Sequence, residues 1–202
     1  NSWERLVRFT ADYNGSGTPQ YEQWSLVLDT ERANTPNNMG YVILRKELTF
    51  AEQVTKENTI YEIRYDFDLG GATVIIPSGC VLKFEGGGLT DSSNDGSIVF
   101  SDTLLDGDIK IDVKSIGGSI SNEHVDIAWF GALPDDEEFD NADVIQKCIH
   151  IAEDSKCKKL YISDGTWYIH KPILITEDKA IDFGGSGKEI ASIKAGAEME
   201  YM

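Results

Sequence analysis

The acidic residues between positions 135 and 143 are the densest group in this chain that could do chemistry. They are Asp135, Asp136, Glu137, Glu138, Asp140 and Asp143. Carboxylate oxygens are the usual ligands of Ca²⁺, and two carboxyl groups facing one substrate could hydrolyse a glycosidic bond. Their spacing does not match an EF-hand loop, and a solvated acidic loop leading into a helix explains the same residues. We therefore predict no metal and no other cofactor here.

The other reactive side chains do not form a recognisable catalytic motif. His124, His150 and His170 lack the H-x-x-H or H-E-x-x-H spacing of metal sites. Ser186 in Gly-Gly-Ser-Gly lacks the G-x-S-x-G frame of a nucleophile elbow. Trp129 and Trp167 could stack on sugars, but we expect them to be buried instead. We predict no catalytic residue within this chain.

An amphipathic helix follows the acidic loop, and Asp140 is its expected N-cap. Its apolar stripe is Val144, Ile145, Cys148, Ile149 and Ala152, and its polar face is Gln146, Lys147, His150, Glu153 and Asp154. A strand over 125–129 precedes the loop, and strands over 159–163 and from 166 onward flank a turn at Asp164-Gly165. The stripe should pack on the end or side of a sheet.

Residues 58–128 have the pattern of a β-rich segment. Strands are expected from Thr59 and over 72–76, 80–84, 97–100 and 109–113, separated by glycine-containing turns. Further strands are expected over 180–183 and 191–194. Thr49-Phe50-Ala51-Glu52 fits a capping box that opens a short helix ending near residue 58. No exact sequence repeat links the strands, although short strands with glycine corners suit a small β-solenoid or sandwich.

The first 48 residues combine many aromatic side chains with long polar loops, and short strands are expected over 25–28 and 41–44. We predict that the aromatic residues dock onto another protein or onto the rest of this chain. The candidate docking residues are Trp3, Phe9, Tyr13, Tyr21 and Trp24.

Composition narrows the classes of partner. The 202 residues carry 18 basic and 35 acidic side chains, a formal charge of −17. Nucleic acid is an unsuitable partner for such a chain, because phosphate binding needs clustered Lys and Arg. No run of eighteen apolar residues predicts a membrane span. Cys80, Cys148 and Cys157 show no disulfide framework, and Cys80 and Cys148 are expected to be buried.

Two stretches resemble known proteins. Gly131-Ala132, Asp140-Asn141, Ile145-Gln146-Lys147 and Gly165-Thr166-Trp167 resemble the entry to pectate-lyase-like right-handed parallel β-helices. The run from Asn58 to residue 87, preceded by Leu44-Arg45-Lys46, resembles a module of tail-spike and tail-fibre proteins of phages and prophages. Two departures from the β-helix pattern are Asp135-Asp136-Glu137-Glu138 in the loop and Ser163 in place of a proline.

These resemblances imply a mainly β fold with three parts. Residues 1–57 would be an anchoring segment, 58–128 a small β-rich neck, and 129–202 a cap helix with the first rungs of a truncated parallel β-helix. The family implies a homotrimeric tail spike or fibre located in the virion. It would attach to other tail or baseplate proteins and adsorb to a bacterial surface polysaccharide.

Two other functions stay open. A polysaccharide lyase or glycoside hydrolase could use the same scaffold, with its active site beyond Met202. A bacterial surface adhesin would need an export signal before Asn1. We expect the chain to be the N-terminal part of a longer protein, with any depolymerase activity in the part that follows.

Overall fold

The structure is a computed structural model that describes residues 7–10, 25–28, 39–175, 180–187 and 190–196. Residues 1–39 and 40–202 form two separate compact units. In the first unit, β1 (Val7–Thr10) pairs in antiparallel fashion with β2 (Ser25–Leu28), which confirms the strand predicted over 25–28. The second unit is mainly β, with parallel sheets and few helices.

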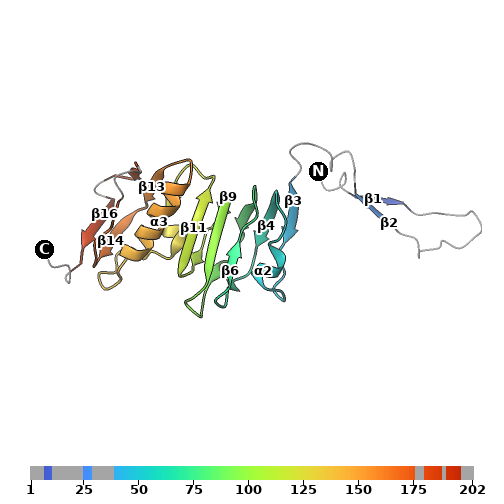
Figure 1. The fold of residues 1–202 in the computed structure, drawn as a ribbon, viewed down its shortest axis with the longest axis horizontal. Coiled ribbons are helices and arrows are strands. Elements are labelled where there is room, and N and C mark those ends of the chain that lie inside the picture. Colours follow the sequence, from blue (N-terminus) through green and yellow to red (C-terminus); the bar gives the residue numbers. More distant parts are fainter. Residues whose placement is uncertain (1–6, 11–24, 29–38, 176–179, 188–189, 197–202) are drawn as a thin grey trace, which may run out of the picture. The chain divides into compact units, whose positions relative to one another are not determined.

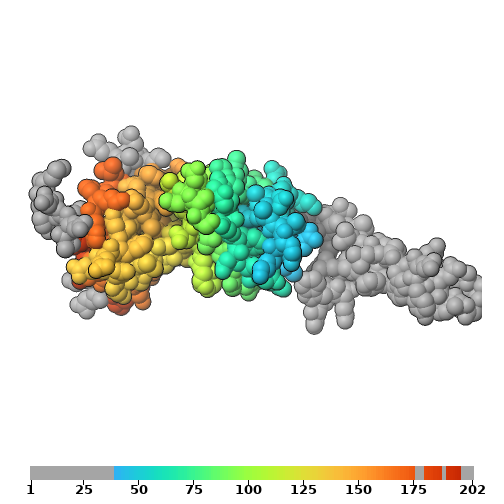
Figure 2. Space-filling model, turned by 90° about the horizontal axis from the view of Figure 1, so that it is seen from below, coloured from blue at the N-terminus to red at the C-terminus, as the bar shows by residue number. Residues whose placement is uncertain are grey.

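Residues 40–120 wind through three parallel ladders, which we call the first stack. The first ladder contains β3 (Gly40–Ile43), β4 (Thr59–Ile63), β7 (Val81–Phe84) and the end of β9 (Ser97–Gly107). The second contains β5 (Phe67–Asp68), β8 (Leu89–Thr90) and β10 (Ile111–Asp112). The third contains β6 (Thr73–Ile75), the start of β9 and β11 (Ser115–Ile120). From β4 onward the chain visits the ladders in this fixed order, so sequence order follows one axis of the unit (Figures 1 and 2).

The interior of the first stack is apolar because alternate residues of each strand point inward. Tyr61, Leu82 and Leu105 occupy neighbouring register positions and are all buried. The side chains one position further along carry alternating charges, Glu62, Lys83 and Asp106. Opposite charges on adjacent strands are favourable cross-strand pairs. Glu62 is itself covered, because Tyr41 and Arg64 donate hydrogen bonds to its carboxylate.

At one corner of the first stack, three successive turns have the same backbone conformation although the residue type differs. Asn58, Gly79 and Asp102 each stand two residues before the registered positions Ile60, Val81 and Leu104. All three have positive φ, at 50°, 68° and 51°. Glycine, asparagine and aspartate are the residues that tolerate this left-handed backbone best. The three turns therefore have equivalent corners although the sequence shows no repeat.

A short helix closes one end of the first stack. α2 (Phe50–Gln53) begins at the predicted capping box, in which Thr49 and Glu52 bond each other's backbone N–H groups. Phe50 and the following Val54 are buried against the core. The helix is a single turn, shorter than the predicted extension to about residue 58, because Val54 leaves the helical conformation.

A second set of parallel strands, the second stack, begins at β12 (Val125–Asp126). β12 pairs with β13 (Lys159–Ile162), and β13 with β15 (Asp182–Gly185). β14 (Gly165–Ile169) pairs with β16 (Ala191–Ala195). The strand predicted over 125–129 is wrong after Asp126. The Asp126 carboxylate accepts a hydrogen bond from the Ala128 N–H and starts the 3₁₀ helix η3 (Ile127–Phe130).

The helix α3 (Ala142–Asp154) lies between the two stacks and contacts both (Figure 1). Its predicted apolar stripe is confirmed, since Ile145, Cys148 and Ile149 are fully buried. Asn141, rather than the predicted Asp140, is the N-cap residue. Glu153 was assigned to the polar face but is buried. A helix that separates two stacks must bury more than one side.

The boundaries predicted at residues 57 and 128 stay a prediction. The ladder from β3 to β4 crosses the first of them, and the contacts of α3 with β11 cross the second. One continuous cluster of buried residues extends from Leu44 to Trp167.

Candidate functional site

The acidic loop that was considered for metal binding is attached along one edge of β14. The Asp135 N–H donates to the Thr166 carbonyl at 2.7 Å, and the Thr166 N–H donates to the Asp135 carboxylate at 2.9 Å. Further along, the Asn141 N–H donates to the Tyr168 carbonyl at 2.9 Å, and the His170 N–H donates to the Asp140 carboxylate at 2.9 Å. The loop thus satisfies backbone groups that an edge strand would leave unpaired.

Asn141 holds this loop from the inside and is fully buried. Its side-chain oxygen accepts from the Leu133 N–H at 2.9 Å, and its side-chain nitrogen donates to the carbonyls of Leu133 and Tyr168 at 3.0 and 3.1 Å. Every hydrogen-bonding atom of the amide is therefore used. This explains the Asp140-Asn141 pair as a structural feature of the loop.

Charge at the loop's end is compensated by Lys171. Its ammonium lies 2.6 Å from the Asp143 carboxylate and 3.6 Å from that of Asp140. Burial raises the pKa of Asp140, but the backbone N–H groups of His170 and Ala142 together with Lys171 outweigh it and lower the pKa below its ordinary value. No group of three or more His, Cys, Asp or Glu side chains within the described residues could hold a metal ion. Asp135 and Asp140 bind the protein's own backbone instead.

The three histidines lie apart and have different surroundings. His150 is exposed on α3 and bonds Gln146, while the His170 ring contacts the Glu137 carbonyl at 2.9 Å. The His124 ring lies 5.4 Å from the ring of Trp129 and 5.1 Å from that of Tyr161. The structure brings no two of these histidines together as a pair.

The two tryptophans that were expected to be buried differ. Trp167 is 1% exposed, and its indole N–H donates to the Ser163 carbonyl at 2.9 Å. Its predicted burial is confirmed. Trp129 is only half-buried, because it lies at the edge of the core beside His124.

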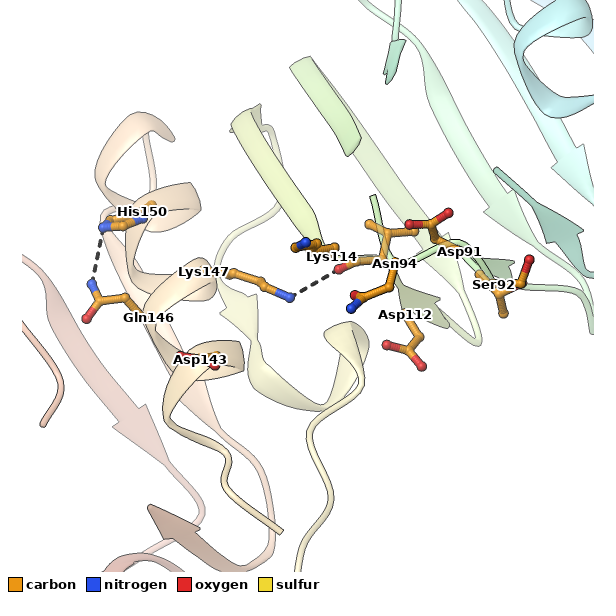
Figure 3. Close-up of a pocket in the computed structure, with 11 residues that line it drawn as sticks. Asp91, Ser92, Asn94, Asp112, Lys114, Asp143, Gln146, Lys147 and His150 are labelled. Carbon is orange, nitrogen blue, oxygen red and sulfur yellow. Dashed lines mark hydrogen bonds between the residues drawn. The ribbon is translucent and has the colours of Figure 1, made fainter. Parts of the chain in front are cut away.

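An open hollow, which we call the junction hollow, lies between the loops that follow β8 and β10 and the exposed side of α3 (Figure 3). Its volume is about 840 Å³. Its lining residues are Thr90, Asp91, Ser92, Asn94, Asp112, Val113, Lys114, Asp143, Gln146, Lys147 and His150. Sequence reasoning did not group these residues. All of them except Val113 are ordinary polar residues at strand ends, in loops or on a helix face, and only the stacking of successive turns brings them together.

One wall of the junction hollow is rigidly built. The Asp91 carboxylate accepts hydrogen bonds from the N–H groups of Gly71, Asp95 and Gly96 and from the Ser93 hydroxyl. Burial raises the pKa of Asp91, but these four donors lower it to about 2. Asp91 therefore organises the loop and keeps its charge at neutral pH.

The opposite wall is formed by Lys147 of α3. Its ammonium donates to the Val113 carbonyl at 3.1 Å, and its side chain is half-buried (Figure 3). Burial lowers the pKa of Lys147, although the charges of Asp112 and Asp143 act in the opposite direction. The cation is thus held at the protein surface with part of its hydration removed.

The predicted docking residues fall almost entirely outside the described part of the chain. Trp3, Tyr13, Tyr21 and Trp24 lie in segments that the structure does not describe. Phe9 lies in β1, for which the backbone pairing with β2 is described. Their docking role stays a prediction.

The described residues contain no helix that is both long and apolar enough to cross a membrane. Comparison with known proteins returned no match of this chain to a protein-family model, to a curated protein or to a solved structure.

Proposed function

We propose that this chain is the N-terminal part of a phage tail spike or tail fibre, a structural component of the virion. Residues 1–57 anchor it to the tail or baseplate, and residues 58–128 form a neck. From residue 129 onward a right-handed parallel β-helix begins, whose distal part binds a glycan on the bacterial surface. One observation carries the proposal: the resembling stretches are built into consecutive parallel ladders joined by α3.

The parallel ladders support the β-helix part of the proposal. Registered partners such as Ile60, Val81 and Leu104 follow one another at roughly 20–25 residues, the lower end of the range for solenoid repeats. Three ladders visited in a fixed order are the arrangement that a coil of short parallel strands produces. The right hand is proposed from the family and from the general preference of parallel crossovers.

The proposed assembly is a homotrimer anchored through residues 1–57, which include the first unit. Residues 1–39 form a compact unit of their own, which supports a separate attachment segment. The aromatic residues of that segment, including Trp3, Phe9 and Trp24, supply the large apolar contacts that protein interfaces favour. The acidic charge of −17 supports protein and glycan partners over nucleic acid.

Mass photometry and cryo-electron microscopy of assembled particles test this proposal. We expect three copies around one axis, attached to tail proteins through residues 1–57. The triple variant W3A/F9A/W24A should fail to enter particles. The matched control Tyr65→Ala removes an aromatic ring that is 44% exposed in the second unit and should leave attachment unchanged.

A stable monomer that never enters particles would contradict the proposal. Release of new reducing or unsaturated sugar ends from capsular polysaccharide by the longer protein that includes residues beyond Met202 would favour the lyase or hydrolase alternative. Display on the surface of the producing bacterium would favour an adhesin.

A further inference from the structure

The junction hollow contains a cation whose hydrogen-bonding capacity is only partly used. An ammonium group has three N–H donors, and Lys147 uses one of them on the Val113 carbonyl. No carboxylate of the described residues lies within ion-pair distance of its ammonium nitrogen. A partly desolvated cation with unused donors gains from acceptor oxygens placed beside it.

Three further side chains of the hollow also have free polar atoms. Asp112, Lys114 and the side-chain amide of Asn94 form no hydrogen bond or ion pair within the part of the chain that the structure describes. Figure 3 shows Asn94 and Asp112 on the side of the hollow that faces Lys147. The hollow therefore offers donors and acceptors together, from the loop residues Asn94, Asp112 and Lys114 and from the helix.

The charges around the hollow nearly cancel. Lys171, at 2.6 Å, compensates Asp143. The remaining lining charges are the carboxylates of Asp91 and Asp112 and the ammonium groups of Lys114 and Lys147. An anionic ligand would be repelled by the two carboxylates, and a cationic ligand by the two ammonium groups. An uncharged ligand meets neither penalty.

The residue types of the lining favour a polar ligand over an apolar one. Val113 is the only hydrophobic residue among the lining residues, and it is buried. Sites for drug-like molecules are lined mainly by hydrophobic and aromatic side chains. A ligand suited to this hollow must instead present many groups that both donate and accept hydrogen bonds.

We propose that the junction hollow binds an uncharged, polyhydroxylated ligand, a short stretch of neutral saccharide. Hydroxyl oxygens accept from Lys147 and Asn94, and hydroxyl hydrogens are donated to Asp112. The volume of about 840 Å³ accommodates more than one sugar ring. This goes beyond the proposed function, in which the surface glycan is bound by the distal β-helix. It rests only on the residues of the hollow.

The experiment is an NMR titration of the whole ¹⁵N-labelled chain with defined probes. Maltotriose, cellotriose and an N-acetylglucosamine trimer are the neutral probes, and trigalacturonate and a glucosamine trimer are the charged comparators. We expect at least one neutral probe, at concentrations up to about 10 mM, to shift the amide signals of residues 112–114 and 146–150. The charged probes should bind more weakly than their neutral counterparts.

Two variants and one control make the titration specific. Lys147→Met keeps the aliphatic stem but removes the donors, and Asp112→Asn removes an exposed carboxylate that forms no hydrogen bond or ion pair within the described residues. Each should weaken binding about tenfold. Lys156→Met is the matched control, because Lys156 is 88% exposed, does not line the hollow and, among the described residues, forms an ion pair only with Asp102 at 3.7 Å. If Lys147→Met does not fold, Asp112→Asn still tests the proposal, provided that its thermal unfolding is unchanged from wild type.

Three outcomes would overturn the inference. They are no binding of any neutral probe, binding that survives in both variants, and preferential binding of the charged probes. None of them affects the count of copies per particle or the attachment of residues 1–57, so failure here is distinguishable from failure of the proposed function.

Discussion

The two stacks use different partners to complete their strands. In the first stack, β4, β7 and the start of β9 have a parallel strand on each side. In the second stack, β14 has β16 on one edge and the acidic loop on the other. α3 packs between the stacks at the point where the ladders change. The difference shows that a loop can take the place of a neighbouring strand when its backbone and side chains form the hydrogen bonds that the strand would have formed.

Side-chain amides perform this replacement repeatedly. Gln53 bonds both the N–H and the carbonyl of Arg45, at 2.7 and 3.0 Å. Asn122 does the same for Leu105, at 2.9 and 2.8 Å, and Gln146 for Leu174, at 2.8 and 3.0 Å. Asn141 does so for Leu133. An amide has the donor and acceptor arrangement of a peptide group, so it can pair with both backbone groups of one residue, as Asn122 does for Leu105 of β9.

The largest expected effect is the difference in stability loss between a substitution in the core of the first stack and one on the surface of the second. Leu82→Ala removes a fully buried side chain and should lower the free energy of unfolding by about 3 kcal/mol, since a cavity is added to the lost burial. Phe183→Ala removes a ring that is 50% exposed and should cost below about 1 kcal/mol. Urea unfolding measures both. Equal losses would show that the second stack is packed as tightly as the first.

The next effect compares two amides that have the same role. Asn141→Ala should cost about 2–3 kcal/mol, because the fully buried amide is lost and backbone groups of Leu133 and Tyr168 lose a partner. Asn122→Ala should cost about 1 kcal/mol, because Asn122 is only partly buried and water can replace it. Thermal unfolding of the two variants checks the order. A larger loss of stability in Asn122→Ala than in Asn141→Ala would contradict this order.

A pH titration tests the loop that Asp91 organises. Its pKa is lowered in the folded chain to about 2 from an ordinary 3.8. The stabilisation it provides is therefore fully present above 3.8 and is lost as the pH falls towards 2. Asp140 in the second stack has a lowered pKa too, so its contribution is lost in the same direction. Carboxyl ¹³C chemical shifts followed during acidification measure both groups.

Asp91→Asn is the control for that titration. It should abolish the loss of order in residues 91–96 that accompanies acidification, while the signals of the second stack still change. Loss of order in this loop at the same pH in wild type and variant would mean that Asp91 does not organise it.

The smallest effect concerns surface ion pairs. Lys171→Met removes contacts to Asp140 and Asp143 and should lower the melting temperature only slightly, and less at high salt. Lys156→Met removes a longer, more exposed pair with Asp102 and should lower it less still. Differential scanning calorimetry at two salt concentrations compares them. A cost above that of Asn122→Ala would contradict the ranking.

Structural features that depend on residues close in the sequence could be predicted from the sequence alone. The stripe of α3 around Ile145 and Cys148, the Thr49 capping box and the burial of Trp167 are all confirmed. The hydrophobic periodicity of a helix and the capping of its first turn involve residues only a few positions apart, so both can be recognised in the sequence. The 3₁₀ helix η3 was not predicted, because the Asp126 side chain bonds the Ala128 N–H in competition with strand pairing.

The sequence by itself therefore determined α3 with its apolar face, the start of α2, several of the strands and the β-rich class, but it missed β11 (Ser115–Ile120) and η3. Only the tertiary structure decided which strands share a ladder, that Asn58, Gly79 and Asp102 occupy one equivalent corner, and that the acidic loop lies on β14. It alone brought Asp91, Asp112 and Lys147 around one hollow. The physical reason is that a left-handed corner accepts several residue types, and a parallel ladder pairs backbone groups that carry no side-chain identity.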